Sequence, residues 1–383
     1  MDPIYLDYNA TTPIDPEIAE TILPFITHHF GNPSSTHAYG TFASRAVNNA
    51  RKQVSDLLNC DPEEVIFTSG GTESNNHAIK GIASTCRHRG NHIITSSVEH
   101  PAVVEVCQWL KTQGFRITYL PVDKFGSIDL VELETAISPD TILITIMHAN
   151  NEVGTVQPIR EITEMAHSRN VLVHTDAAQS AGKISTDVQD LGVDLLSLAG
   201  HKLYAPKGIG ALFVKKGISL SNLMHGAGHE MGSRAGTENV IHITGLGKAC
   251  EMIKDNLDEY SRHMASMRNS LETGLRLNIP NALFNGHPSQ RLPNTSSVSF
   301  QSLEADNLLS KLNRIAISAG AACHSDRIEI SSVLQAMAIP LDYAMGTLRI
   351  STGRFTTGEE IDIAISDITK VVTNEYKSKS KTA

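Results

Sequence analysis

Short apolar runs alternate with helical patterns along residues 65–214. Runs of strand length, rich in β-branched and aliphatic residues, are expected at 65–67, 93–95, 116–120, 141–147, 171–174, 195–199 and 211–214. Most are separated by stretches of helical periodicity, such as those at 73–86, 102–112 and 159–168. This alternation predicts an α/β fold with a mostly parallel, doubly wound sheet of seven strands, whose ligands bind at the carboxyl ends of the strands.

The chain before this region predicts an arm and two helices. Residues 1–15 are too polar and turn-rich for a core helix, so we expect an extended arm that packs with the C-terminal domain. Helices are expected at 16–29, with Asp15 as the cap, and at 38–59.

The chain after this region predicts a second, smaller α/β domain. A helical stretch at about 241–277 leads to expected strands at 296–300, 316–318 and 347–351, with a final helix at 358–376. The Lys/Ser-rich end at 377–383 is expected to be frayed. We therefore predict an arm at 1–15, a large domain at 16–255 and a small C-terminal domain at 256–383.

Composition and charge narrow the function classes. The 383 residues are 40% hydrophobic and 19% charged, as in an ordinary soluble globular protein. A formal net charge of −9 argues against nucleic acid or an anionic membrane as partner. No apolar run approaches the ~20 residues of a membrane span, and the first residues lack a signal-peptide pattern, so a cytoplasmic location is expected. The five cysteines are scattered without a CxxC pair, which indicates neither a zinc site nor a disulfide framework.

Gly200-His201-Lys202 directly follows the predicted strand at 195–199. A lysine held where an apolar strand ends loses solvation, and its pKa then falls toward the range in which the amine is nucleophilic. Such an amine can form a Schiff base with a carbonyl compound or with pyridoxal phosphate. Taken alone, however, this motif is more typical of a surface lysine at a strand end, so the rest of the chain decides.

Ser69-Gly70-Gly71-Thr72 leads from a predicted strand into a helix. The first N–H groups of the helix and its dipole form an anion cradle, with the hydroxyl of Thr72 close by. A plain helix cap is the simpler alternative. The motif differs from the GxxxxGK[ST] nucleotide loop, so ATP binding is not indicated.

Other predicted strands also end in polar groups. Asp176 closes the strand at 171–174 and precedes Lys202 by 26 residues, which is enough for one helical crossover. A carboxylate there needs a cation such as a pyridinium nitrogen, or it caps a helix. His100 and Asn151 follow two further strands. Together, these strand ends favour a site over separate structural roles.

Two features of the predicted small domain carry chemistry. Cys323 lies in Ala319-Gly320-Ala321-Ala322-Cys323-His324, where small neighbours suit an exposed loop and a reactive thiolate. The other four cysteines are placed in or beside helices and are expected to be inert. Arg349 lies inside the apolar strand at 347–351 and needs an anion, for which a carboxylate is the natural partner.

The combination of these motifs resembles the cysteine desulfurases of the class V aminotransferase family, with the type I fold of pyridoxal-phosphate (PLP) enzymes. The resemblance covers nearly the whole chain and is carried by Asp7-Tyr8-Asn9-Ala10-Thr11-Thr12, Ser69-Gly70-Gly71-Thr72-Glu73-Ser74-Asn75, His148-Ala149-Asn150-Asn151-Glu152-Val153-Gly154, Gly200-His201-Lys202, Arg234-Ala235-Gly236-Thr237-Glu238-Asn239 and Leu348-Arg349.

The resemblance implies a role for each site residue. Lys202 would bind PLP as a Schiff base and move the substrate proton, Cys323 would take the sulfur as a persulfide, and His100 would stack on the ring. Asp176 would pair with the pyridine nitrogen, and Arg349 would bind the substrate carboxylate. The remaining cofactor contacts would come from Gly71, Thr72, Asn151, Gln179, His201 and, from the neighbouring subunit of a homodimer, Thr237.

The implied reaction converts L-cysteine to L-alanine and passes the sulfur to an acceptor protein or a small thiol, for iron–sulfur cluster or thio-cofactor and tRNA synthesis. The loop Ala-Ala-Cys-His-Ser-Asp around Cys323 is similar to that of selenocysteine lyases, so L-selenocysteine is the alternative substrate. Ala199 also stands where many desulfurases have a serine that contacts the phosphate. A class V aminotransferase and a non-catalytic sulfur carrier are further alternatives.

Overall fold

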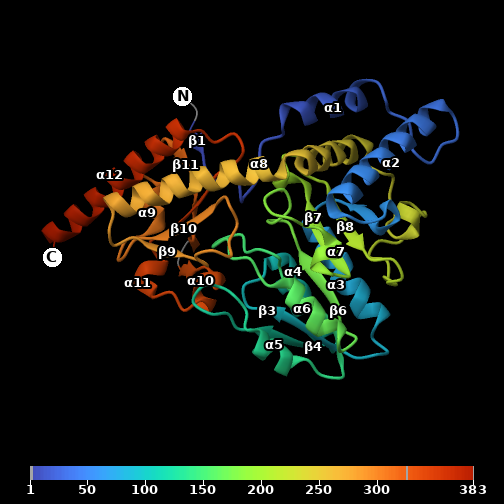
Figure 1. Cartoon of the computed structure of the whole chain (residues 1–383), viewed down its shortest axis with the longest axis horizontal. Helices are drawn as coiled ribbons and strands as arrows, with labels where there is room; N and C mark the ends of the chain where they lie inside the picture. Colours follow the sequence, from blue (N-terminus) through green and yellow to red (C-terminus); the bar gives the residue numbers. More distant parts are fainter. Residues whose placement is uncertain (1–2, 325–326, 383) are drawn as a thin grey trace.

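A seven-stranded sheet forms the centre of the larger of two bodies, on the right in Figure 1. The computed structural model describes residues 3–324 and 327–382, with the backbone alone at 321–324, 327–329 and 381–382. The strand order is β2-β8-β7-β6-β5-β3-β4. Every pair is parallel except the two made by β8, so the mostly parallel sheet expected from the sequence is confirmed. The strands are β2 (Val65–Thr68), β3 (His92–Ser96), β4 (Arg116–Leu120), β5 (Thr141–Thr145), β6 (Leu172–Asp176), β7 (Leu195–Ala199) and β8 (Gly210–Val214).

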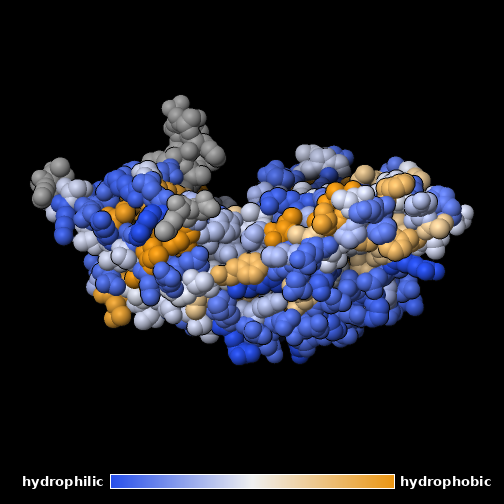
Figure 2. Space-filling view, turned by 90° about the horizontal axis from the view of Figure 1, so that it is seen from above, coloured by the Kyte–Doolittle hydropathy of each residue, from blue (hydrophilic) through white to orange (hydrophobic). Residues whose placement is uncertain are grey.

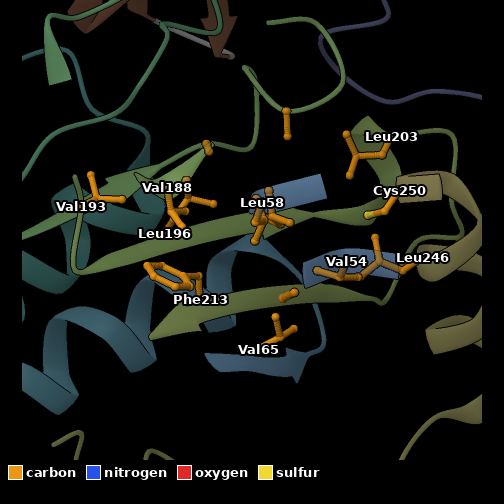
Figure 3. Close-up of a cluster of buried hydrophobic side chains, with 14 of the residues drawn as sticks. Val54, Leu58, Val65, Val188, Val193, Leu196, Leu203, Phe213, Leu246 and Cys250 are labelled. Atoms are coloured by element: carbon orange, nitrogen blue, oxygen red, sulfur yellow. The ribbon is translucent and has the colours of Figure 1, made fainter. Parts of the chain in front are cut away.

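Alternation along the strands divides the core between the two faces of the sheet. In β2, Val65 and Phe67 join one hydrophobic cluster, whereas Ile66 joins the cluster on the opposite face. The first cluster packs under α1 (Pro16–Thr27), α2 (Ala38–Leu58), α5 (Leu130–Ala136), α6 (Ile159–His167), α7 (Val188–Leu191) and the first half of α8 (Val240–Asn278) (Figure 3). The second packs under α3 (Gly71–Thr85) and α4 (Pro101–Thr112). Both faces are thus covered, as a parallel sheet requires.

A four-stranded antiparallel sheet forms a second body with its own core. Its order is β12 (Ser318–Ala319), β15 (Thr347–Ser351), β10 (Thr295–Ser299) and β9 (Leu283–Asn285). The second half of α8 and the final helix α12 (Gly358–Thr382) cover it, with Leu271 and Ile368 in the core. The remaining elements are α9 (Ala305–Leu309), α10 (Ser332–Ala336), α11 (Leu341–Ala344), the hairpin β13 (Ala321–His324) with β14 (Arg327–Ile330), and the short 3₁₀ turns Pro62–Glu64, Gly200–Lys202 and Glu230–Gly232.

Two expectations for this second body are wrong. The strand expected at 316–318 is divided: β11 (Ile315–Ala316) pairs with β1 (Ile4–Tyr5), whereas β12 pairs with β15. The end expected to be frayed is helical up to Thr382. It contains no helix breaker, and Lys379 donates a hydrogen bond to the carbonyl of Ser302.

The arm and α8 connect the two bodies. Ile4 and Tyr5 of the arm pair with β11, and Leu6 is buried in the core of the second body. Helix α8 is continuous over 39 residues and contributes to both cores. Because α8 passes the expected boundary without a break, the division into 1–15, 16–255 and 256–383 stays a prediction. Among the described helices, none is long and apolar enough to cross a membrane.

Candidate active site

A cavity of about 360 Å³ opens where the parallel strands end, a volume typical of small-molecule sites. The loops after β3, β5, β6 and β7, the start of α3, the arm and β15 all contribute side chains to it. Nine of the residues predicted for the site line this one cavity: Gly71, Thr72, His100, Asn151, Asp176, Gln179, His201, Lys202 and Arg349.

The sequence predicted no cofactor or substrate contact for the remaining lining residues. They are Asn9, Ala10, Asn75, Ala102, Met147, Ala149, Ala178 and Ala199. Asn9 and Asn75 lie within motifs that had been singled out, and their amides were the available signal. Ala10 and Ala149 lie in quoted motifs and Ala199 was noted in place of a serine, but an alanine side chain itself gives no chemical signal.

Lys202 lies in the 3₁₀ turn that follows β7. Its Nζ donates to the carbonyl of Ala10 at 2.8 Å and to that of Asn9. Removal from water, and then the nearby Arg349, lower the pKa of the Lys202 amine to about 8, although Asp176 acts in the opposite direction. About one tenth of the amine is therefore neutral at pH 7, a far larger share than for an ordinary lysine.

The carboxylate of Asp176 is only 7% exposed. One oxygen accepts a hydrogen bond from the backbone N–H of Ala178 at 2.9 Å, and the other accepts from Nδ2 of Asn75 at 2.6 Å. Among the residues that the structure describes, no cation forms an ion pair with it. A buried carboxylate of this kind suits a ligand that brings its own positive charge.

The start of α3 lines another part of the cavity, through Gly71 and Thr72. The helix begins at Gly71, after Gly70 in a conformation with φ of 148° that favours glycine. A Cβ on Gly71 would come within 3.3 Å of the methyl group of Ala199 and would narrow the cavity there. Because the first N–H groups of a helix have no partner within it, they are available to a phosphate.

Two histidines lie on the cavity, and both are neutral near pH 7. Burial lowers the pKa of His201 to about 4, with Lys202 and other cations adding to the effect. The pKa of His100 is also lowered, first because surrounding protein removes water from the ring and further because of Lys202. Nδ1 of His100 accepts a hydrogen bond from the N–H of Ala102 at 3.1 Å, which places the proton of the neutral ring on Nε2.

Arg349 projects from β15, and the carboxylate of Asp7 already provides one anion for its guanidinium. Its Nη2 donates to the carboxylate of Asp7 at 2.9 Å and to the hydroxyl of Ser318 at 3.0 Å. Nη1 makes only a 3.4 Å contact with the carbonyl of Asn151, and Nε has no partner in the described part of the chain. The guanidinium therefore retains donors for a carboxylate in the cavity.

The two other predicted site residues are Thr237 and Cys323, of which Thr237 does not line the cavity. Thr237 is exposed in the loop before α8, so a role toward a neighbouring subunit stays a prediction. For Cys323 the structure describes the backbone in β13 and not the side chain, so the thiol lies outside the described residues. Cys323 follows Ser318, the partner of Arg349, by five residues, which span at most about 17 Å.

Comparison with known proteins gives consistent matches over nearly the whole chain. The family model described as aminotransferase class V matches residues 4–363. The cysteine desulfurase IscS of Methanosarcina thermophila is 48% identical over 371 residues, covering 96% of this chain and 92% of that protein.

Solved structures agree with these matches. A NifS-like protein superposes with a TM-score of 0.91 at 37% identity, over 97% of this chain and 99% of that one. The structure described as SspA in complex with cysteine superposes with a TM-score of 0.81 at 38% identity, over 92% and 100% of the two chains.

Proposed function

The chain belongs to the aminotransferase class V family, and from this premise we propose that it is a PLP-dependent cysteine desulfurase. It converts L-cysteine to L-alanine and takes the sulfur as a persulfide on Cys323. One observation carries the proposal: an amine with a lowered pKa, a buried carboxylate that pairs with no cation of the described residues, and a helix N-terminus share one cavity. The named relatives support the same activity.

The residues present fit PLP. Lys202 would hold it covalently, Asp176 would pair with its pyridinium nitrogen, and the start of α3 at Gly71 and Thr72 would bind its phosphate, with His201 beside it. Asn151 and Gln179 would lie near the ring and its phenolic oxygen, and His100 on the ring face. When bound, PLP supplies an electron sink for the bond to the substrate α-carbon.

The chain's own groups supply binding and proton transfer. Arg349 orients the substrate through its carboxylate, using the donors that Asp7 and Ser318 leave available. The amine of Lys202 accepts and returns a proton at Nζ, for which its lowered pKa is suited. His100 offers a proton on Nε2 at the same cavity.

Cys323 completes the reaction as the nucleophile. Its thiolate attacks the substrate sulfur, so that an S–S bond forms while the C–S bond of the substrate breaks. The electron pair of the broken bond stays with the substrate carbon, which takes up a proton and becomes the methyl group of alanine. The persulfide then passes to an acceptor protein or a small thiol.

A homodimer belongs to the proposal. Large apolar side chains are exposed on α1, α2 and the turn between them, and Figure 2 shows orange and pale orange residues on this side of the molecule. They are Leu23, Ile26, Phe30, Tyr39 and Phe42. A second copy could cover this surface, and the family resemblance would have its Thr237 contact the phosphate of PLP. A cytoplasmic location likewise stays a prediction.

Alanine formation and the mass of the Cys323 peptide test the proposed function. Purified protein given L-cysteine should release alanine without a keto acid and gain one sulfur on that peptide. Cys323→Ala should lose the activity and keep the yellow colour of bound PLP. The matched control Cys60→Ala should change neither, because burial raises the pKa of that thiol to about 12. Full activity of Cys323→Ala, or colourless wild-type protein, would contradict the proposal.

The loop around Cys323 makes selenocysteine the second candidate substrate. The ratio of kcat/KM for L-selenocysteine and L-cysteine decides between the two. A preference for selenocysteine of two orders of magnitude or more would make the protein a selenocysteine lyase. A requirement for a keto acid would instead make it an aminotransferase.

A further inference from the structure

Lys183 is a buried lysine that the proposed reaction does not use. Its side chain is 4% exposed in the turns that follow β6. Nζ donates to the backbone carbonyl of Gln179 at 2.9 Å and to Oε1 of the same residue at 3.0 Å. In the described ranges no carboxylate forms an ion pair with it. Burying an amine without a counter-charge costs free energy, and the hydrogen bonds to Gln179 partly offset that cost.

The surroundings of Lys183 add no electrostatic stabilisation. The charged groups that act on it are Lys202 and Arg349, both cations, and together with burial they lower its pKa well below the usual value. Leu203, Ile253 and Met264 line the small apolar cavity beside it. An apolar residue of similar length would be expected to fit this environment at least as well.

The hydrogen bonds of Gln179 favour one orientation of its side-chain amide. Oε1 faces the amine of Lys183, and Nε2 donates to the carbonyl of Asn9 at 2.9 Å. That carbonyl also accepts from Nζ of Lys202. Turning the amide over would place its oxygen against the carbonyl of Asn9, so that hydrogen bond would be lost, and the amine of Lys183 would have to accept where it now donates.

We propose that Lys183 is a positioning residue, which holds the amide of Gln179 so that its N–H group, and not its oxygen, is presented to the cavity. The inference rests on the proposed function, in which Gln179 lies near the phenolic oxygen of bound PLP. An N–H there stabilises negative charge on that oxygen, whereas Oε1 in the same place would repel it. Gln179 lines the cavity, whereas Lys183 lines the separate, smaller cavity and contacts Gln179 from there.

Lys183→Met tests this inference, because methionine has similar length and no donor. The absorbance of bound PLP changes with pH, and its midpoint should rise by up to about one pH unit, the size expected for loss of one hydrogen bond. We expect kcat/KM to fall about ten-fold. Thermal stability should be unchanged or higher, since an uncompensated buried amine is removed. Lys183→Leu is a second apolar variant should methionine prevent folding.

A double variant separates an effect of Lys183 through Gln179 from a direct effect of the Lys183 amine on the cavity. If Lys183 acts only through Gln179, adding Lys183→Met to Gln179→Leu should move neither the midpoint nor kcat/KM further. The control Lys207→Met removes an exposed positive charge that acts on His201 and should leave the midpoint unchanged. The inference is overturned if Lys183→Met titrates like the wild type, or if its effect persists in the Gln179→Leu background. Wild-type protein that neither binds PLP nor forms alanine would instead refute the proposed function, before any substitution is made.

Discussion

The ion pair between Arg51 and Glu230 gives a sharp prediction for stability. Arg51 in α2 donates both Nη atoms to Glu230 at 2.8 Å, and Glu230 also accepts from the N–H of Phe67 at 2.8 Å. Both residues are buried, with 8% and 4% of their surface exposed. Glu230 and Met231 have φ of 48° and 56°, so this pair also holds a turn in a left-handed conformation.

Glu230→Gln should strongly destabilise the protein, because it leaves the guanidinium of Arg51 buried without a counter-charge. Breaking such a pair costs about 3–5 kcal/mol. For 383 residues that unfold as one unit, an unfolding entropy of about 2.1 cal/mol/K per residue sums to about 0.8 kcal/mol/K, so 4 kcal/mol corresponds to about 5 °C in Tm. Arg51→Met should cost a similar amount, and the double variant no more than either single one.

Scanning fluorimetry of the four proteins at one concentration measures these shifts. Lys52→Met is the matched control, since it breaks an exposed pair with Asp56 one position along the same helix, at side-chain exposures of 64% and 42%. That pair is worth at most about 1 kcal/mol, or about 1 °C. Single-variant shifts no larger than this control, or a double variant that loses the sum of both shifts, would refute the reasoning.

Three further measurements follow from the structure. The rate at which the cofactor-free protein captures PLP through Lys202 should rise with pH and level off above about 8, because only the neutral amine reacts and its pKa is about 8; a rate that is flat from pH 6 to 9 would contradict this. Iodoacetamide at pH 8 should modify Cys323 well before the thiols whose pKa burial raises to about 12, and peptide masses report the order for Cys60, Cys107 and Cys250. Gly247→Ala should lower Tm, since its Cβ would come within 2.6 Å of Ala50 where α8 crosses α2; an unchanged Tm would show that the two helices can separate freely.

Local pattern determined the strands, most of the helices and much of the candidate site. Apolar runs separated by helical patterns are a local signal, and all seven predicted strands are present in the described central sheet. The ends of these strands are local as well, and because parallel strands end at one edge, the sequence alone predicts that Asp176, His201 and Lys202 lie together, as they do at the cavity.

Contacts between distant segments were decided only by the tertiary structure. Asp7 lies 342 residues from Arg349 in the sequence and accepts a hydrogen bond from its guanidinium, for which the sequence predicted only a ligand anion. Arg51 and Glu230 are 179 residues apart, and no local pattern pairs them. The physical reason is that a buried charge or amide needs a partner. Which group becomes that partner depends on how distant elements pack together. Lys183 shows this most clearly. A lysine four residues after Gln179 gives no signal in the sequence, and only the packed core directs its amine toward the Gln179 side chain.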